Sequence, residues 1–272
     1  LGDVYKRQPL RYSIPFNEDN RYLVMPALSD ALKIVGLKTV TFAPKNPEKG
    51  KSTISGSVIL SDYETGETLS VLDGGYLTKI RTGAISGVAT KYLSRENANT
   101  LCVIGAGEQA EGLIAAVLAV RNINTIHFAS RTIEKAERLA KQTKDLYDVN
   151  VEVFEDANQA IEGTDIVVTA TNSSTPVFDR TLDPGVHLNA VGSFKPDMQE
   201  LPTESMMVAN KIVVESTEAA MEETGDLKIP EQEGVLTQDM LHAELGDIVA
   251  GRKQGRTDEK AVSYTHLRAH ET

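Results

Sequence analysis

The sequence predicts an α/β protein in which a doubly wound parallel sheet of the Rossmann type is accompanied by a smaller mixed α+β domain. One observation is the alternation of apolar, β-branched runs with helical periods from about residue 99 onward. Another is a Gly-x-Gly-x-x-Ala turn, residues 105–110, between the first of these runs and the helical period after it. A third is the contrasting pattern of residues 9–71, where strand-like runs are separated by clusters of Pro, Asn and Gly.

The alternating part of the chain predicts strands and helices in the order of consecutive βαβ units. The expected strands are 101–105, 125–129, 151–154, 165–171, 186–191 and 211–215, and the expected helices are 109–120, 132–146 and 156–162. Such alternation predicts parallel strands with helices on both faces of the sheet. In the first part of the chain, the runs 22–25, 37–42 and 57–60 indicate a small mixed or antiparallel sheet. A helix over 82–93 connects the two parts, and the chain from about residue 236 is expected to be helical again.

The composition excludes several classes of protein. With 272 residues, the chain can bury a core sufficient for one large or two modest domains. Its net charge of −11 argues against a nucleic-acid partner, and no apolar stretch approaches the roughly 18 residues of a membrane span. The single cysteine, Cys102, excludes an internal disulfide framework and fits a reducing compartment, so we expect a cytoplasmic protein. The histidines are scattered, so we expect no metal site.

The two ends of the chain, residues 1–8 and 263–272, do not continue the patterns of the segments that they flank. Both resemble translated sequencing-adapter sequence, and the chain does not begin with Met. We therefore treat them as non-native ends, exclude them from the fold prediction and expect the natural protein to extend further in both directions.

The Gly-x-Gly-x-x-Ala turn has the spacing of a dinucleotide-binding turn. Gly105 permits a tight turn out of the preceding strand, Gly107 allows the backbone to approach a pyrophosphate, and Ala110 allows the following helix to pack close to the strand. The free N–H groups at the start of that helix favour phosphate. We therefore expect the cofactor to contact Gly105, Ala106, Gly107, Glu108, Gln109 and Ala110.

The end of the next strand indicates which dinucleotide binds. An NAD-specific site carries an Asp or Glu there, which binds the ribose 2′-hydroxyl. This chain has Ser130, Arg131 and Thr132 instead, and a guanidinium can pair with a 2′-phosphate. We therefore expect NADP(H) in preference to NAD(H). The alternative is that Arg131 only solvates the start of a helix capped by Thr132, with Glu134 as an early acid.

Several motifs along the chain occur in an order that is typical of one family. Residues 81–84 are Arg-Thr-Gly-Ala, 103–110 contain the glycine turn, 165–171 are Asp-Ile-Val-Val-Thr-Ala-Thr, and 189–201 end in Phe-Lys-Pro-Asp-Met-Gln-Glu-Leu. Shorter similarities lie at 25–27, 36–40 and 243–251. Together these motifs resemble the ornithine cyclodeaminase/mu-crystallin family over nearly the whole chain between its two ends.

The resemblance implies a Rossmann domain joined to a substrate and dimerisation domain that both ends of the chain build. We accordingly expect the substrate and dimerisation domain at 9–94, completed by 236–262, and the dinucleotide-binding domain at 95–235. The resemblance also implies a homodimer, and hydride exchange between a nicotinamide and the α-carbon of a small amino or imino acid.

The resemblance further implies that cations hold the substrate carboxylate, and the matching positions are Arg11, Lys38 and Arg81. Lys38 is also expected to take part in catalysis. Arg81 directly precedes Thr82, which we expect to cap a helix, so the guanidinium would lie beside the positive helix end. Lys38 lies within an apolar strand, where a solvated lysine is the alternative.

By the same resemblance, Asp197 corresponds to the catalytic aspartate of the family. It follows the strand at 186–191, so we expect it outside the carboxyl ends of the parallel strands, where it can hydrogen-bond the substrate nitrogen as a general acid or base. The alternative is a turn aspartate after proline. Candidate contacts to the nicotinamide ribose are Thr171, Asn172, Ser173 and Ser193.

The residues favour one activity within the family. An ornithine cyclodeaminase is expected to carry an acid two positions before the Met25-Pro26 pair, and here that position is Leu23. Together with Ser130 and Arg131, this favours an NADPH-dependent reductase of a cyclic ketimine, pyrroline-2-carboxylate or piperideine-2-carboxylate, that yields an L-amino acid. The alternatives are an NAD-dependent ornithine cyclodeaminase that forms proline and ammonia, an alanine dehydrogenase-like activity on a smaller substrate, and an NADPH- and ligand-binding protein with little turnover.

Overall fold

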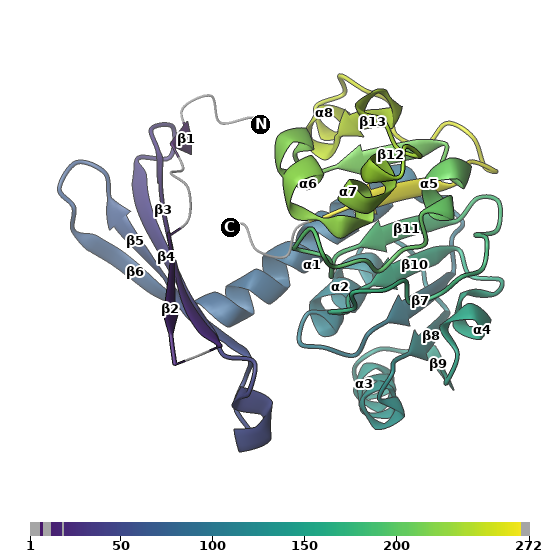
Figure 1. The fold of residues 1–272 in the computed structure, drawn as a ribbon, viewed down its shortest axis with the longest axis horizontal. Helices are drawn as coiled ribbons and strands as arrows, with labels where there is room; N and C mark the ends of the chain where they lie inside the picture. The colour runs from purple at the N-terminus through teal and green to yellow at the C-terminus, as the bar shows by residue number, and fades with distance from the viewer. Residues whose placement is uncertain (1–5, 8–11, 18, 268–272) are drawn as a thin grey trace. The chain divides into compact units, whose positions relative to one another are not determined.

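The computed structural model describes residues 6–7, 12–17 and 19–267, and the chain divides between Thr78 and Lys79 into two compact units (Figure 1). The smaller unit contains an antiparallel sheet and the larger unit a parallel sheet with helices. The division lies earlier in the chain than the boundary expected near residue 95, because it falls within the long helix α1 (Gly74–Leu93).

The smaller unit is built around a sheet of antiparallel strands. Its strands are β1 (Lys6–Arg7), β2 (Tyr12–Phe16), β3 (Asn20–Ser29), β4 (Ile34–Phe42), β5 (Ile54–Asp62) and β6 (Thr68–Asp73), with the 3-10 helix η1 (Asn46–Lys49) after β4. The order is β1-β3-β4-β5-β6, with β2 also paired to β3, and all pairs are antiparallel. In the turn after β5, the Asp62 carboxylate accepts the N–H groups of Thr65 and Glu64, and Gly66 adopts a φ of +73°. These hydrogen bonds lower the pKa of Asp62, and the one from Thr65 has the largest effect.

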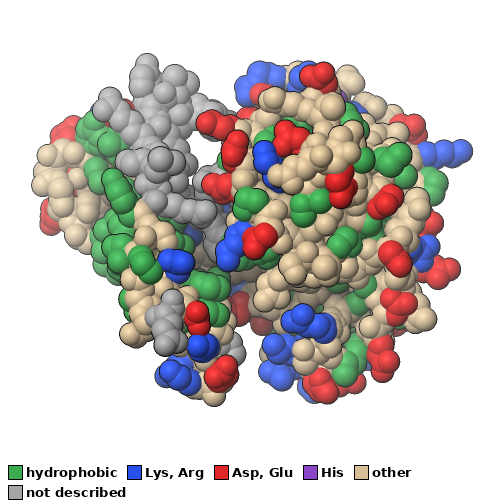
Figure 2. All heavy atoms as spheres, viewed as in Figure 1, with side chains coloured by type: hydrophobic (Ala, Val, Ile, Leu, Met, Phe, Trp, Pro, Cys, Tyr) green, Lys and Arg blue, Asp and Glu red, His purple; other side chains and the backbone are tan. Residues whose placement is uncertain are grey.

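The two faces of this sheet differ in exposure. Lys38, Val40 and Val58 are buried on one face. Because successive side chains point to opposite faces, the other face carries Tyr12 and Val71, each 64% exposed. Figure 2 shows hydrophobic side chains along the strands of this unit. The register therefore leaves one apolar face that the described residues do not cover.

Helix α1 begins at Gly74, not at Thr82 as predicted. The residue before it, Asp73, acts as the cap, because its carboxylate accepts the N–H of Tyr76 at 2.7 Å. The expectation that Thr82 caps a helix and places Arg81 beside the positive end was therefore wrong. Both residues lie in the helix interior, and Thr82 is fully buried. The glycine pair after the cap is a poor helix former, which hid this start in the sequence.

The larger unit contains an eight-stranded sheet with the order β13-β12-β14-β11-β10-β7-β8-β9, in which all neighbouring strands are parallel. The strands are β7 (Thr100–Ile104), β8 (Thr125–Ala129), β9 (Asn150–Phe154), β10 (Ile166–Thr169), β11 (His187–Ala190), β12 (Lys211–Val214), β13 (Leu241–Glu244) and β14 (Ser263–His266). The helices that follow α1 are α2 (Ala110–Leu118), α3 (Ile133–Leu146), α4 (Ala157–Ile161), α5 (Glu204–Val208), α6 (Thr217–Glu223), α7 (Gly225–Gln232), η2 (Gln238–Met240) and α8 (Leu245–Val249).

The central strands of this sheet are buried on both faces. In β7, Leu101 and Val103 join one hydrophobic cluster with residues of α1, α2 and α3, whereas Cys102 joins a second cluster with residues of α4, α6 and α7. Because side chains alternate along a strand, the two clusters mark two layers of helices, one on each face. The predicted fold class, a doubly wound parallel sheet together with a smaller mixed α+β domain, is thus confirmed, and the smaller unit contains an antiparallel sheet (Figure 1).

Helices α1 and α2 cross through small residues. A Cβ on Gly83 would lie 2.2 Å from the carbonyl oxygen of Gly112, and one on Gly87 would lie 2.9 Å from that of Ala116. Real side chains do not tolerate such distances, so the two backbones approach closely only because these positions lack a Cβ. The glycine of the Arg-Thr-Gly-Ala motif is therefore a packing residue.

The C-terminal part of the chain differs from the expected helical tail. Residues 236–262 lie in the larger unit and not with the smaller domain as expected, because β13 pairs with β12. The segment 263–272, which was excluded from the fold prediction, contributes β14 to the same sheet. β14 pairs with β11 on one side and β12 on the other, so it fills the space between them. The foreign origin of this segment stays a prediction.

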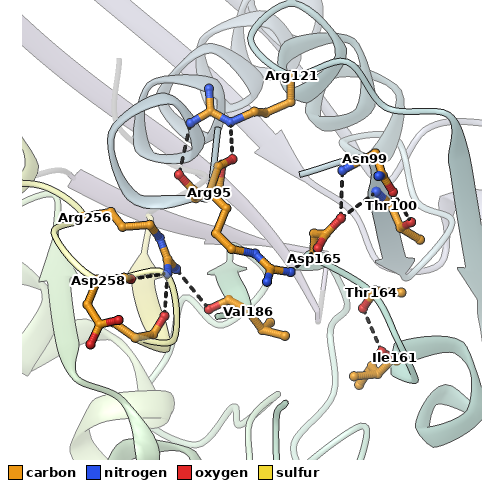
Figure 3. A network of polar contacts seen from close by, with 12 residues as sticks. Arg95, Asn99, Thr100, Arg121, Ile161, Thr164, Asp165, Val186, Arg256 and Asp258 are labelled. Carbon is orange, nitrogen blue, oxygen red and sulfur yellow. Dashed lines mark hydrogen bonds and ion pairs between the residues drawn. The ribbon is translucent and has the colours of Figure 1, made fainter. Parts of the chain in front are cut away.

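A network of polar contacts lies at the amino ends of the parallel strands (Figure 3). Asp165, just before β10, accepts the N–H groups of Asn99 and Thr100 and forms an ion pair with Arg95. Arg121 donates to carbonyl groups at the C-terminal end of α1, including that of Lys91 at 2.9 Å. These contacts tie strands and helix together at the end of the sheet opposite to the one at which open α/β sheets bind ligands.

Candidate functional site

The order of the larger sheet reverses at β7 and β10. From β7 the chain continues to β8 and β9 on one side, whereas β10 is followed by β11 on the other. Open α/β sheets bind ligands in the crevice at the carboxyl ends of such a strand pair. Main-chain bonds fix both loops there: the Gly105 N–H donates to Ala129 O at 2.8 Å, and the Ala170 N–H donates to Ile104 O at 2.9 Å.

The turn after β7 has the backbone that its glycines predict. Gly105 has a φ of +107°, and a Cβ on it would lie 2.5 Å from the carbonyl oxygen of Ala170. Gly107 is exposed, and a Cβ there would meet no heavy atom of the described residues within 4 Å. Ala110 is fully buried at the start of α2. The fold thus requires glycine at position 105, whereas position 107 leaves open space beside the turn.

The residues of this turn fit the phosphates of a dinucleotide. Gln109 precedes α2, and no side chain caps the first N–H groups of that helix. Such N–H groups and the positive helix end favour an anion. In the described part of the chain, the buried Oε1 atom of Gln109 has no hydrogen-bond partner. In the same turn, Ala106 is partly exposed and Glu108 is exposed. Open space, unused donors and an orphaned acceptor are what a bound dinucleotide would use.

The loop after β8 presents the polar residues that the cofactor prediction depends on. Ser130 Oγ accepts the N–H of Thr132 at 3.3 Å, and Thr132 has the extended backbone of a cap of α3 but makes no capping hydrogen bond. Arg131 is exposed, and its guanidinium makes no hydrogen bond or ion pair with any residue that the structure describes. The guanidinium is therefore available to an anionic ligand.

The loop after β10 uses two of its three predicted ribose contacts in its own structure. Thr171 Oγ1 accepts the N–H of Ser173 at 3.2 Å, and Ser173 Oγ donates to the carbonyl of Thr175 at 2.6 Å. Asn172 between them is exposed. Of the three predicted contacts in this loop, Asn172 is thus the exposed one.

Asp197 lies at the exposed tip of the loop that follows β11. The Met198 N–H donates to Lys195 O at 3.1 Å, which closes a turn around Asp197. Ser193 Oγ donates to Met198 O at 2.7 Å and accepts the hydroxyl of Thr224, and Ser193 is fully buried. The structure therefore presents the Asp197 carboxylate at the carboxyl end of the sheet, whereas the Ser193 hydroxyl is used inside the loop.

The candidate cations lie in both units, and each is described within its own. Lys38 on β4 is 5% exposed, and its ammonium donates to the Thr78 hydroxyl at 3.0 Å, which in turn donates to Gly74 O at 2.6 Å. Lys38 is therefore not a solvated lysine. Arg81 is partly buried and is the eighth residue of α1, in the larger unit. Arg11 lies outside the described residues.

Sequence reasoning missed a fully buried carboxylate behind these loops, that of Glu200. Its Oε1 accepts the Thr171 N–H at 2.6 Å, and its Oε2 accepts the Gly192 N–H at 2.7 Å and the Thr169 hydroxyl at 2.9 Å. Burial raises the pKa of Glu200, although the bonds from Thr171 oppose this. The one signal in the sequence is an acidic residue at the end of the Asp197 motif, directly before Leu201.

A second buried carboxylate, Asp226 in the first turn of α7, supports the first. Its Oδ1 accepts the main-chain N–H groups of Glu200 at 2.6 Å and Leu201 at 3.0 Å. Burial, and then the charge of Glu200, raise the pKa of Asp226 well above its usual value.

Cys102 is fully buried in β7, and burial raises the pKa of its thiol, so it is an unreactive core residue. Within the described residues, no helix is long and apolar enough to cross a membrane. The same residues contain no group of three or more His, Cys, Asp or Glu that could hold a metal ion.

Comparison with known proteins places these features in context. A model of the ornithine cyclodeaminase/mu-crystallin family matches residues 2–264. A Delta(1)-pyrroline-2-carboxylate reductase of Bacillus cereus is 53% identical over 256 residues, which cover 94% of this chain and 79% of that protein. The structure of Thermococcus litoralis Delta(1)-pyrroline-2-carboxylate reductase in complex with NADH and L-proline is similar with a TM-score of 0.90 and 34% identity, over 97% of this chain and 82% of that chain. An archaeal alanine dehydrogenase dimer with bound NAD is similar with a TM-score of 0.87 and 32% identity, over 97% and 80% of the two chains.

Proposed function

Because the chain belongs to the ornithine cyclodeaminase/mu-crystallin family, we propose that it is a nicotinamide-dependent reductase of a cyclic ketimine, pyrroline-2-carboxylate or piperideine-2-carboxylate, and that it forms the L-amino acid. The observation that carries this proposal is the 53% identity to a Delta(1)-pyrroline-2-carboxylate reductase over 256 residues. A match of that length contains both the glycine turn and the Asp197 loop. The similar structure with NADH and L-proline supports a nicotinamide and a cyclic amino acid as ligands of this fold.

Reduction of a cyclic ketimine adds a hydride to the imine carbon and a proton to the imine nitrogen. The reduced nicotinamide supplies the hydride when it is bound. We propose that Asp197 donates the proton to the imine nitrogen, because its carboxyl group is exposed to water at the carboxyl end of the sheet. Protonation of the nitrogen makes the neighbouring carbon a better hydride acceptor, so this group acts directly on the reacting atoms.

We propose that the substrate carboxylate is bound by Lys38, Arg81 and Arg11. The Thr78 hydroxyl restricts Lys38 to few orientations, which suits both the binding of a small anion and the orientation of the imine for catalysis. A guanidinium such as that of Arg81 can bind a carboxylate through two parallel hydrogen bonds.

We further propose NADP(H) in preference to NAD(H). The support is that Arg131 is exposed and unpaired among the described residues, at the strand end where an NAD site would carry an acid. The turn at 105–110 would hold the pyrophosphate, with Ser130 and Thr132 beside the adenosine ribose. Thr171, Asn172 and Ser173 would lie near the nicotinamide ribose.

We also propose a cytoplasmic homodimer that pairs through the uncovered face of the smaller sheet. Tyr12, Ile14 and Val71 expose between 53% and 64% of their surface on that face. Apolar residues gathered on one face of a soluble protein mark an interaction surface. The similarity to an alanine dehydrogenase dimer supports a second copy of the chain as the occupant.

The test is oxidation of NADPH and NADH with pyrroline-2-carboxylate, followed for the wild type, Asp197→Asn and the control Asp148→Asn. Asp148 is an exposed aspartate in the same unit. We expect turnover with NADPH, a loss of about 100-fold or more in kcat for Asp197→Asn, and no change for the control.

Other outcomes would indicate the other activities. Release of ammonia from ornithine with NAD would identify a cyclodeaminase, and reductive amination of pyruvate would identify an alanine dehydrogenase. Tight NADPH binding without turnover on any imine would identify a binding protein and overturn the proposal.

A further inference from the structure

We propose that Glu200 is a positioning residue for the reaction, whose buried carboxylate fixes the Asp197 loop against the carboxyl ends of β10 and β11. The inference rests on the proposed function, because it assumes that Asp197 acts on the substrate. Glu200 itself is fully buried and behind the loop, so it acts through Asp197 and not on the reacting atoms.

The Glu200 side chain joins two neighbouring strands where both end. One carboxylate oxygen accepts an N–H from the loop after β10, at Thr171, and the other accepts an N–H from the loop after β11, at Gly192. No space separates these loops, because a Cβ on Gly192 would lie 2.0 Å from the Thr171 carbonyl oxygen and 2.6 Å from Oε1 of Glu200. The carboxylate therefore sets the spacing of the two loops that carry Asp197 and the candidate ribose contacts.

The main chain of Glu200 fixes the other end of the Asp197 loop. Asp226 accepts the N–H groups of Glu200 and Leu201, and the Gly225 N–H donates to Lys195 O at 3.0 Å. Asp197 lies between Lys195 and Glu200 in sequence, so the start of α7 holds the loop on both sides of it. The Glu200 side chain then connects this anchored loop to the strand ends.

The cost of this arrangement points to a role beyond stability. Burial of two carboxylates is expensive even when they are hydrogen-bonded, so buried charged groups are weak evidence of a contribution to stability. Here the hydrogen bonds of Glu200 go to the two loops at the candidate site, and Asp226 supports Glu200. The buried polar groups therefore lie where fixed geometry matters for catalysis.

The experiment compares Glu200→Gln with Asp197→Asn and with the double variant. Glutamine keeps the size of the side chain, but its amide nitrogen cannot accept an N–H, so at least one bond to a loop is lost. We measure the NADPH dissociation constant, and kcat per NADPH-binding site, so that unfolded protein does not count. We expect Glu200→Gln to lower kcat by about tenfold or more, with the NADPH dissociation constant unchanged within about threefold.

The double variant distinguishes positioning of Asp197 from an independent effect. If Glu200 acts through Asp197, adding Glu200→Gln to Asp197→Asn lowers kcat by less than about threefold more. Full multiplication of the two effects, or an unchanged kcat per site in Glu200→Gln with only a lower melting temperature, would overturn the inference and leave the proposed function intact. An unaffected Asp197→Asn variant would instead overturn the proposed role of Asp197, and this inference with it.

A second pair of variants decides the matter if Glu200→Gln does not fold. Thr169→Val removes only the hydroxyl that donates to Oε2, and Thr169→Ser keeps it. We expect a partial loss of kcat in the valine variant and rescue in the serine variant, whereas equal kcat values in the two would contradict the positioning role.

Discussion

Replacement of Tyr264 by Phe should stabilise this chain, although most core substitutions destabilise a protein. Tyr264 is 1% exposed in β14, and its hydroxyl has no hydrogen-bond partner among the residues that the structure describes. A buried hydroxyl without a partner has lost its bonds to water, which costs about 1–3 kcal/mol. Phenylalanine keeps the ring and its packing, so we expect the free energy of unfolding to rise by about 1–2 kcal/mol.

The assay is urea unfolding of the wild type and Tyr264→Phe, with Tyr147→Phe as the control. Tyr147 is partly exposed, so its hydroxyl can bond to water and its removal should change stability by less than about 0.5 kcal/mol. The same argument predicts a gain for Thr265→Val, because the Thr265 hydroxyl is also buried and unpaired in the described structure. A loss of stability in Tyr264→Phe would show that its hydroxyl is bonded in the folded protein, and would refute this account of β14.

Four further predictions concern the larger unit. Arg131→Glu should lower kcat/KM for NADPH by about tenfold or more and favour NADH, because it would place an acid at the proposed position of the 2′-phosphate. Steady-state kinetics with both cofactors measures this. Gly83→Ala should lower the free energy of unfolding by about 1–3 kcal/mol, since its Cβ would overlap Gly112, and urea unfolding tests it. Burial, with the charge of Arg256, lowers the pKa of His187 to about 3 from 6.5. The neutral imidazole therefore contributes to stability above pH 6.5, and this contribution is lost as the pH falls. Between pH 6.5 and 5, the free energy of unfolding of the wild type should fall by about 2 kcal/mol more than that of His187→Asn, as measured by urea unfolding. Cys102 should react with a thiol reagent only after unfolding, because burial removes its access and raises its pKa, and rapid labelling of the native protein would contradict its place in the core.

The elements of the larger unit could be predicted because they depend on local patterns. β8 covers the predicted residues 125–129, and α3 begins one residue after the predicted start. A strand buried on both faces is a short apolar run, and a helix between sheet and solvent has a period of about 3.6 residues, whatever the rest of the fold. Gly105 is predictable for the same reason, because its φ of +107° is a requirement of its own backbone.

Strand partners and helix starts depend on residues far apart or on single side chains, so the sequence concealed them. β14 joins β11 and β12 with the residues Ser-Tyr-Thr-His, which have no apolar strand pattern, and main-chain pairing on both sides holds it there. The sequence pattern predicts no helix across the glycine pair, yet α1 begins there, and the Asp73 carboxylate caps it by accepting the N–H of Tyr76. A prediction from periodicity cannot weigh such a contact, because it is absent until the chain has folded.

The residues of the candidate site show the same difference between local patterns and contacts of distant residues. A residue proposed to contact a ligand has a side chain that suits the chemistry of that ligand, so Arg131 and Asp197 could be proposed from residue type and motif. Glu200 bonds instead to main-chain N–H groups, and the one at Thr171 is 29 residues away in sequence. Every residue except proline has such a group, so no pattern records which carboxylate accepts it. A buried carboxylate that accepts main-chain N–H groups at a candidate site is therefore best treated as a residue that positions the backbone, and a double-variant cycle is the experiment that separates this role from catalysis.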